Sequence, residues 1–334
     1  MNIIIPMAGR GTRLRPHTLT IPKPLIPIAG KPIVQRLVED IVEVCDDKVE
    51  NIGFIIGDFG KEVEEHLLKI AKSLGAKGHI YHQEQALGTA HAILCAEELL
   101  TGKTIIAFAD TLFRADFTLD SSKDGIIWVQ KVDDPKAFGV VKFNDDGVIT
   151  DFVEKPQEFV SDLAIIGIYY MKDGDFLRSE LQYLIDNDIK DKGEFQLTNA
   201  LENMRLKGSK FVPGKVDEWL DCGNKDVTVN TNMRYLDFIK DKKLISDSAK
   251  ISNSTIIEPV YIGENVEINN SVIGPHVSIG DNTKISRSII DTSLIQNNSV
   301  VNGMNATNSM IGNFVQYHEI ADDLSIGDYN VVKK

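Results

Sequence analysis

The chain has 334 residues, 43% of them hydrophobic and 25% charged, which predicts a globular protein of about two domains. Its net charge of −13 argues against a nucleic-acid partner, because affinity for a phosphate backbone depends on Lys and Arg. No apolar run approaches the roughly 18 residues that span a bilayer, and the 3 cysteines lack metal or redox spacing, so we expect a cytoplasmic protein with no membrane partner.

The first part of the chain alternates short apolar runs with longer amphipathic stretches. Residues 2–5, 51–57 and 104–110 have the length of strands, and residues 61–75 carry apolar side chains at helical spacing. This alternation predicts βαβ units around a mostly parallel sheet, and therefore the α/β class. Further along, the sequence NDDG at residues 144–147 predicts a hairpin between alternating strands, so we expect β-ribbons inserted in the sheet.

After about residue 243 the composition shifts toward Ile, Val, Asn, Ser and Gly. Isoleucine then recurs at steps of five or six, which suits a β-solenoid with one interior side chain on each short face. An ordinary β-sandwich with chance spacing is the alternative, and residues 302–310 depart from the pattern. The residues concerned are Ile262, Ile268, Ile273, Ile279, Ile285, Ile290 and Ile295.

Residues 260–288 resemble the hexapeptide repeats of left-handed β-helices. We therefore expect two domains, residues 1–243 with the α/β sheet and residues 244–334 with a short left-handed β-helix. We expect the second domain to assemble the chain into a homo-oligomer.

The turn after the first strand contains Gly9 and Gly11, followed by Thr12 and Arg13. Glycine lets bare backbone N–H groups approach a phosphate closely. Alone, this pattern is a weak signal, since it is more often a simple tight turn. It is neither a Walker loop nor a Rossmann fingerprint.

Two neighbouring motifs are more specific, because residues 9–16 read GRGTRLRP and residues 22–27 read PKPLIP. Together they resemble the signature of the sugar-1-phosphate nucleotidylyltransferases. The resemblance implies a Rossmann-like domain that joins a sugar 1-phosphate to a nucleoside triphosphate and releases pyrophosphate. Further motifs follow in the family's order: QEQALGTAHAI (83–93), FADTLF (108–113), FGVVKF (138–143), VEKP (153–156), GEFQLTNAL (193–201) and WLDCGN (219–224).

The implied reaction needs no general base, because a phosphate monoester with a second pKa of about 6 is already an anionic nucleophile at neutral pH. Catalysis must align two anions in line and relieve their charge. The resemblance implies that Arg13 holds the β and γ phosphates with backbone donors from Gly11 and Thr12. It also implies that Lys23 reaches the α-phosphate and that Lys155 grips the phosphate of the sugar.

Asp110 ends an apolar run, at the carboxyl edge of a predicted strand, where α/β sheets keep their sites. Together with Asp221 it offers hard oxygen ligands, and we expect the pair to hold Mg²⁺. Asp226 is the alternative second ligand.

The base is expected to meet Gln83, whose amide offers a donor and an acceptor to the N3–H and C4 carbonyl of a pyrimidine. Gly88 leaves room for the ring edge, and Thr89 follows in the same nucleotide-binding motif. The resemblance therefore implies UTP or dTTP. Ala8, which precedes Gly9 in the nucleotide loop, is typical of uridylyl enzymes, whereas the short β-helix is typical of thymidylyl enzymes.

For the sugar, most simply glucose 1-phosphate, the resemblance implies contacts from the Gly139 backbone, the Glu154 carboxylate and Lys155. Asp162 is a further candidate, although many family members have Asn there. Carboxylates suit the hydroxyl groups of a polyol.

Two other functions are alternatives. An acyltransferase working through the β-helix would need a histidine facing a cleft, for which His276 and His318 are the candidates. A non-enzymatic regulatory subunit would be expected to have lost the phosphate-binding residues, which this chain retains. We expect structural roles for His17, His82 and His91, which share no metal or triad spacing.

Overall fold

The computed structural model describes residues 1–9, 11–114 and 119–320. Contacts divide the chain into two compact units, Met1–Pro27 with Lys31–Val227, and Ile28–Gly30 with Thr228–Lys334. The expected domain boundary after residue 243 stays a prediction. Within the described residues, no helix is both long enough and apolar enough to cross a membrane.

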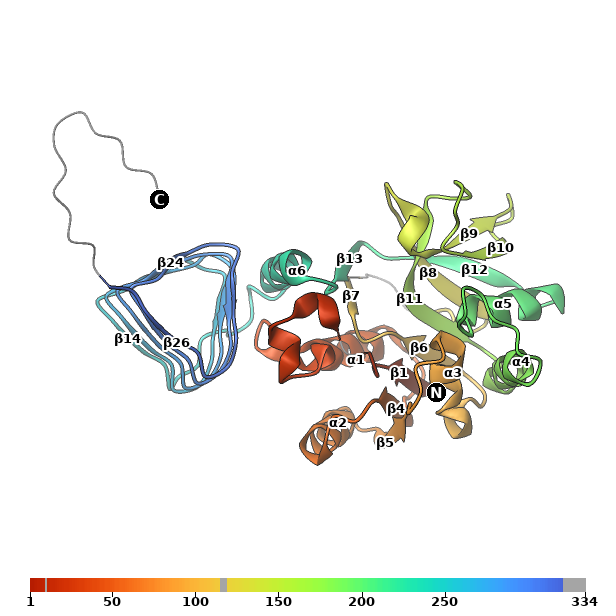
Figure 1. The fold of residues 1–334 in the computed structure, drawn as a ribbon, viewed down its shortest axis with the longest axis horizontal. Helices are drawn as coiled ribbons and strands as arrows, with labels where there is room; N and C mark the ends of the chain where they lie inside the picture. The colour runs from red at the N-terminus through yellow and green to blue at the C-terminus, as the bar shows by residue number, and fades with distance from the viewer. Residues whose placement is uncertain (10, 115–118, 321–334) are drawn as a thin grey trace. The chain divides into compact units, whose positions relative to one another are not determined.

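The first unit is built on a nine-stranded mixed sheet in the order β10-β9-β11-β6-β1-β4-β5, with β8 and β12 joined beside β11 (Figure 1). Strands β6, β1, β4 and β5 are mutually parallel, while β11 runs antiparallel to β6, β8 and β9. The parallel half and the antiparallel ribbons confirm the predicted α/β class. The strands are β1 (Asn2–Pro6), β4 (Asn51–Ile56), β5 (Lys77–His82), β6 (Thr104–Ala107), β8 (Gly125–Lys131), β9 (Gly139–Phe143), β10 (Ile149–Glu154), β11 (Leu163–Met171) and β12 (Phe211–Lys215).

The central strand β1 is buried on both faces, and Ile3, Ile4 and Ile5 have no exposed surface. A continuous apolar run of this kind is what a parallel strand covered on both sides requires. Ile4 belongs to a core that also contains Leu177 of α4 and Leu201 of α5. The helices are α1 (Ile33–Val44), α2 (Lys61–Ser73), α3 (Thr89–Leu94), α4 (Gly174–Asp186), α5 (Leu197–Leu206) and α6 (Lys225–Phe238), and α2 is the helix predicted from residues 61–75.

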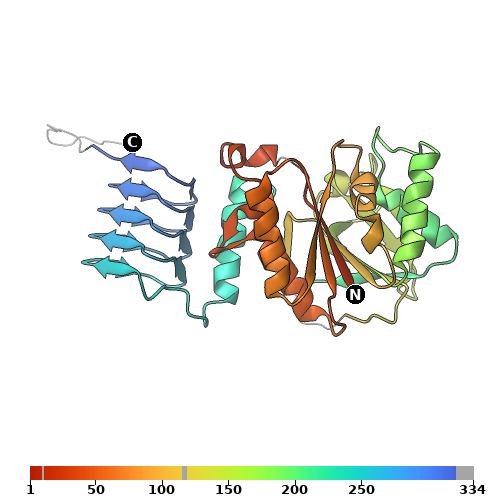
Figure 2. The ribbon, with the colours of Figure 1, turned by 90° about the horizontal axis from the view of Figure 1, so that it is seen from below.

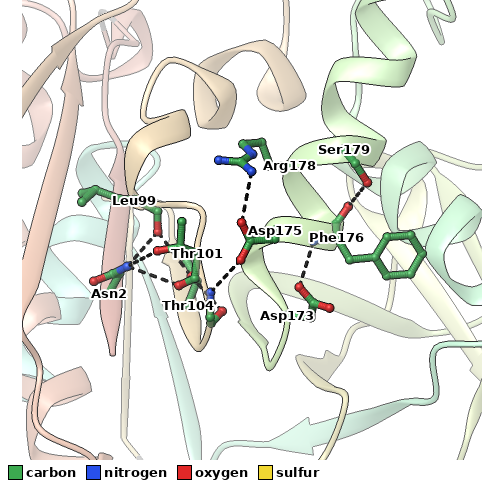
Figure 3. Close-up of polar contacts among 10 residues, drawn as sticks. Asn2, Leu99, Thr101, Thr104, Asp173, Asp175, Phe176, Arg178 and Ser179 are labelled. Atoms are coloured by element: carbon green, nitrogen blue, oxygen red, sulfur yellow. Dashed lines mark hydrogen bonds and ion pairs between the residues drawn. The ribbon is translucent and has the colours of Figure 1, made fainter.

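The loop that leads into β6 is fixed by hydrogen bonds from two directions (Figure 3). The Asn2 side-chain amide donates to the carbonyl oxygens of Leu99 and Thr101, at 2.9 and 3.4 Å. Asp175, in the first turn of α4, accepts a bond from the backbone N–H of Gly102 at 3.3 Å. The start of β6 is therefore held in place, and this strand leads directly to Asp110.

The second unit contains a β-helix made of three parallel sheets; Figure 1 shows its three sides, and Figure 2 shows its stacked turns. Each turn of the chain contributes one short strand to each sheet, and the strands stack in register. The strands are β14 (Lys250–Ser252), β15 (Thr255–Ile256), β16 (Val260–Ile262), β17 (Glu267–Asn269), β18 (Val272–Ile273), β19 (Val277–Ile279), β20 (Lys284–Ser286), β21 (Ile289–Ile290), β22 (Ser293–Ile295), β23 (Val300–Asn302), β24 (Asn305–Ala306), β25 (Met310–Ile311) and β26 (Gln316–His318).

The seven isoleucines chosen from the sequence spacing all lie in the interior of this β-helix, each at most 2% exposed. The repeat shortens along the chain, because Lys250 pairs with Glu267 and Glu267 with Lys284, but Lys284 pairs with Val300. The interior positions nevertheless continue at steps of five or six, because Ile290 pairs with Ala306 and Ile295 with Ile311. Residues 302–310 therefore depart from the pattern in residue type, with alanine in place of isoleucine at position 306. Met304 takes an interior position there.

Neighbouring residues of β21 provide a direct test of this core. Ile290 is 1% exposed, whereas Ile289 is 56% exposed. We expect Ile290→Ala to lower the free energy of unfolding by about 2–5 kcal/mol, because a buried cavity is left behind. The matched change Ile289→Ala should alter it by less than about 0.5 kcal/mol. Urea unfolding followed by circular dichroism measures both, and equal effects would contradict the assigned interior.

Candidate functional site

A cavity of about 410 Å³ lies where three parallel strands of the first unit end. Residues 8–13 follow β1, Gln83 follows β5, and residues 108–110 follow β6. Because the carboxyl ends of parallel strands meet at one edge, segments far apart in the sequence converge there. The cavity brings together every residue predicted to bind the nucleotide and also Lys23; its lining includes Ala8, Gly9, Gly11, Thr12, Arg13, Lys23, Gln83, Gly88, Thr89 and Asp110.

The glycine-rich turn packs directly on Lys23. Gly11 has a φ of +61°, and a Cβ atom there would lie 2.7 Å from Cβ of Lys23. The hydroxyl of Thr18 donates to the Gly11 carbonyl at 2.8 Å, which ties the turn to the next part of the loop. A short 3-10 helix, Thr12–Leu14, begins after Gly11 and carries Arg13 at the cavity. A larger residue at position 11 would therefore displace the lysine.

Lys23 is a buried cation. Its side chain is 8% exposed, and its Nζ lies 3.0 Å from Oδ2 of Asp110, whose side chain is 46% exposed. Lysine is almost never buried without a partner, and a solvated surface charge does not describe this residue. The lysine is thus held at the cavity by the carboxylate that the sequence predicts as a metal ligand.

Asp221 lies beside Asp110 through a two-stranded ribbon. Strands β7 (Thr111–Arg114) and β13 (Glu218–Asp221) are antiparallel with Asp221 opposite Thr111, and the backbone N–H of Cys222 donates to the Asp110 carbonyl at 3.1 Å. Burial raises the pKa of the Asp221 carboxyl; the charge of Lys23 opposes this shift, and the charge of Asp110 adds to it. The two acids therefore interact electrostatically across the ribbon.

This donor set fits a hard divalent cation, because a cation would allow both carboxylates to remain ionised. In the described part of the chain no group of three or more His, Cys, Asp or Glu side chains is placed to hold a metal. A cation held by Asp110 and Asp221 would therefore take its other ligands from phosphate oxygens and water. The rival ligand Asp226 lies in the first turn of α6, where its 70% exposed side chain forms an ion pair with Lys225.

The base side of the cavity is formed by the loop before α3. Gly88 has a φ of +113°, and a Cβ atom there would lie 2.4 Å from the carbonyl oxygen of Phe195. The hydroxyl of Thr89 donates to Oε1 of Gln196 at 3.1 Å and accepts from the backbone N–H of Leu197 at 2.9 Å. The loop is thereby clamped against the segment 194–198. Glycine is required at position 88 by both space and backbone conformation.

Three of the four residues predicted for the sugar lie together. Gly139 is opposite Glu154 in the β9–β10 pair, and Nζ of Lys155 lies 3.4 Å from Oε1 of Glu154. Glu154 also accepts a hydrogen bond at 3.2 Å from the hydroxyl of Thr198. Asp162 instead forms an ion pair at 2.9 Å with the exposed Lys131. None of the four predicted residues lines the 410 Å³ cavity.

Sequence reasoning missed the residues that connect these two groups. Glu194 lines the cavity, while Gln196 and Thr198 are 4% and 5% exposed and bond to Thr89 and Glu154. The motif GEFQLTNAL contains all three of these residues, so the signal was present. The sequence did not show that Gln196 would bond to Thr89 and Thr198 to Glu154, because these contacts depend on the fold.

The histidines of the β-helix have different surroundings. Nε2 of His276 lies 2.8 Å from Oδ1 of Asp237 in α6, so this side chain already has a partner in its own unit. His318 is exposed on β26.

Comparison with known proteins gives consistent findings. Residues 2–237 match the nucleotidyl transferase family model, and residues 231–310 match the model of a GlmU-like C-terminal hexapeptide region. The bifunctional protein GlmU of Methanococcus vannielii is 31% identical over 267 residues, which cover 77% of this chain and 61% of the relative. The present chain thus spans about three fifths of the length of these relatives, as the 61% coverage shows.

Other relatives carry different names. The low-salt glycan biosynthesis nucleotidyltransferase Agl11 of Haloferax volcanii is 29% identical, covering 75% of this chain and 71% of the relative. The mannose-1-phosphate guanylyltransferase catalytic subunit beta of Drosophila melanogaster is also 29% identical, covering 78% and 70%. A solved structure of UDP-glucose pyrophosphorylase complexed with UDP-glucose has a TM-score of 0.58 and 25% identity, covering 71% of this chain and 98% of that chain.

These matches confirm the resemblance that the sequence motifs indicated. The hexapeptide match also agrees with the β-solenoid predicted from the isoleucine spacing and with the resemblance of residues 260–288 to left-handed β-helices. The chain belongs to the nucleotidyl transferase family and carries a GlmU-like hexapeptide region.

Proposed function

We propose that this chain joins a sugar 1-phosphate to a nucleoside triphosphate, giving a nucleotide sugar and pyrophosphate. The observation that carries the proposal is the convergence of a glycine turn, a buried lysine and a carboxylate in one cavity, with Asp221 beside that carboxylate. Two anions must meet in this reaction, so positive charge and backbone N–H groups are the chemistry required.

Each side chain has a distinct task in this proposal. Arg13 and the N–H groups of Gly11 and Thr12 hold the β and γ phosphates, and Lys23 stabilises the charge that grows on the α-phosphate. Lys155 holds the phosphate of the sugar in line for attack. When bound at Asp110 and Asp221, Mg²⁺ would withdraw charge from the phosphate oxygens.

For the substrates we propose UTP or dTTP and glucose 1-phosphate. Gln83 and Gly88 at the cavity support a pyrimidine, while Glu154, Gly139 and Lys155 form the polar group for the sugar. One relative is named as a guanylyltransferase, and one solved structure contains UDP-glucose. Guanine and uracil both carry an N–H in the ring. Pyrophosphate release across a grid of triphosphates and sugar 1-phosphates tests the assignment.

We further propose that the protein works in the cytoplasm as a homo-oligomer assembled through the β-helix, without a nucleic-acid or membrane partner. The net charge of −13 supports the part of this proposal that concerns nucleic acid, because affinity for a phosphate backbone depends on Lys and Arg. Light scattering of the purified chain measures the oligomer.

Lys23→Ala should lower turnover by about two to four orders of magnitude, because it removes charge stabilisation that grows in the transition state. Pyrophosphate release under saturating substrates measures it. Lys31→Ala is the matched control, since Lys31 lies in the same segment but pairs with Glu39 at 2.8 Å. Near-normal turnover of a folded Lys23→Ala protein would rule out its contact with the α-phosphate.

The two carboxylates should differ in a magnesium titration. Asp221→Asn should raise the Mg²⁺ concentration needed for half-maximal turnover, because one ligand charge is lost. Asp110→Asn should nearly abolish turnover at any Mg²⁺ concentration, because it removes a ligand and the partner of Lys23. Asp226→Asn should behave as wild type. If Asp226→Asn lost activity while Asp221→Asn was unaffected, the second metal ligand would be assigned to Asp226.

The acyltransferase alternative can be tested through His276. His276→Ala should lower the free energy of unfolding by about 1 kcal/mol, because it removes the bond to Asp237, while nucleotidyl transfer stays unchanged. His318→Ala should affect neither. Rapid acetyl-CoA consumption by wild type that is lost in His276→Ala would instead favour acyl transfer by the β-helix.

A further inference from the structure

The side-chain amide of Gln83 is held in one orientation at the cavity. Its Nε2 lies 3.3 Å from the carbonyl oxygen of Gly88 and 3.2 Å from Nδ1 of His91. A backbone carbonyl only accepts hydrogen bonds, so the atom that faces it must be the NH₂ group of the amide. Both N–H bonds of that group are then used inside the protein. Among the described residues, Oε1 of Gln83 has no hydrogen-bond partner.

The same geometry fixes the state of His91. Because Nε2 of Gln83 is a donor, Nδ1 of His91 must accept, and the proton of the neutral ring therefore lies on Nε2. Burial lowers the pKa of His91, which also favours the neutral ring. A protonated ring, or the neutral tautomer with its proton on Nδ1, would place an N–H against the NH₂ of Gln83.

Both acceptors that hold Gln83 are rigid. The Gly88 carbonyl also accepts the backbone N–H of Ala92 at 3.1 Å, and any Cβ at Gly88 would collide with Phe195. His91 lies one turn further along α3. The amide is therefore oriented before a nucleotide arrives, and turning it over would place Oε1 against two acceptors.

A glutamine held in this way can only accept from a ligand. Uracil, thymine and guanine carry an N–H on the pairing edge of the ring, whereas cytosine and adenine carry an unprotonated nitrogen at that place. The sequence alone suggested that Gln83 would offer both a donor and an acceptor, and that His91 would be merely structural. The geometry instead leaves one acceptor, whose direction depends on His91.

We propose that His91 is a positioning residue for nucleotide choice, which holds the Gln83 amide so that the site accepts bases with a ring N–H and rejects cytosine and adenine. This inference rests on the proposed function, because it assumes that the base binds at Gln83. It names the feature of the base that the site reads, and it explains why a histidine outside the cavity lining matters to the ligand.

The test compares UTP and CTP binding to the full chain by equilibrium titration in the presence of Mg²⁺. His91→Leu keeps bulk but removes the acceptor, and His91→Asn places an amide oxygen near the position of Nδ1. His79→Leu is the matched control, because His79 lies on β5 and also bonds a side-chain amide, Asn51, at 3.0 Å. Gln83→Ala removes the group that His91 is proposed to orient.

We expect the preference for UTP over CTP to fall about tenfold in His91→Leu, because a free amide can turn over and pair with cytosine. The same preference should fall in Gln83→Ala, recover in His91→Asn, and stay at the wild-type value in His79→Leu. A simple packing defect would weaken both nucleotides alike and would not be rescued by asparagine.

Pyrophosphate release with glucose 1-phosphate is measured in parallel. The wild-type protein could prefer UTP, lose that preference in His91→Leu, and yet turn over no sugar 1-phosphate. This result would support the inference and overturn the proposed reaction. An active enzyme whose UTP preference is unchanged in His91→Leu would overturn the inference and leave the reaction standing. Equal binding of UTP and CTP by wild type would also overturn the inference.

Discussion

The ion pair between Lys23 and Asp110 determines how charge is distributed in this site. The Lys23 side chain is 8% exposed and its Nζ lies 3.0 Å from the Asp110 carboxylate, so each group has a partner. A buried lysine without one would be strongly destabilising. In the proposed function, a triphosphate would bring a second partner for Lys23, and the carboxylate would then be available to a cation. Binding of this kind would exchange one set of ion pairs for another.

The loops that deliver backbone donors to the same place depend on close approach of the backbone. At Gly11 a Cβ atom would reach within 2.7 Å of Lys23, and at Gly88 one would reach within 2.4 Å of the Phe195 carbonyl. Both glycines have positive φ values, which other residues adopt at a cost. Gly11 therefore determines the position of the Lys23 side chain, and Gly88 provides the carbonyl that orients Gln83. Glycine at these two positions thus allows the close packing that fixes the side chains of Lys23 and Gln83.

Much of the architecture was predictable from the sequence, because it depends on periodicity. The helical spacing of residues 61–75 and the solenoid spacing of the isoleucines each describe which side chains share a face, and burial follows directly. Pairings between distant segments do not follow from periodicity. The contact of Lys23 with Asp110 and the orientation of the Gln83 amide needed the sheet edge to be assembled first. The shortened turns of the β-helix are likewise defined by strand pairing, since Glu267 pairs with Lys284 but Lys284 pairs with Val300.

The segment from Glu194 to Thr198 shows why the two halves of the site cannot be treated separately. Gln196 accepts from Thr89 on the proposed nucleotide side, and Thr198 donates to Glu154 on the proposed sugar side. Both side chains are at least nine-tenths buried, so water does not replace these bonds easily. Gln196 and Thr198 are two residues apart on one backbone. The position of the loop at Thr89 and that of the Glu154 carboxylate are therefore fixed together. For a reaction in which two anions must meet in line, a shared support of this kind limits relative displacement of the reacting groups, which is where catalysis by positioning is most sensitive.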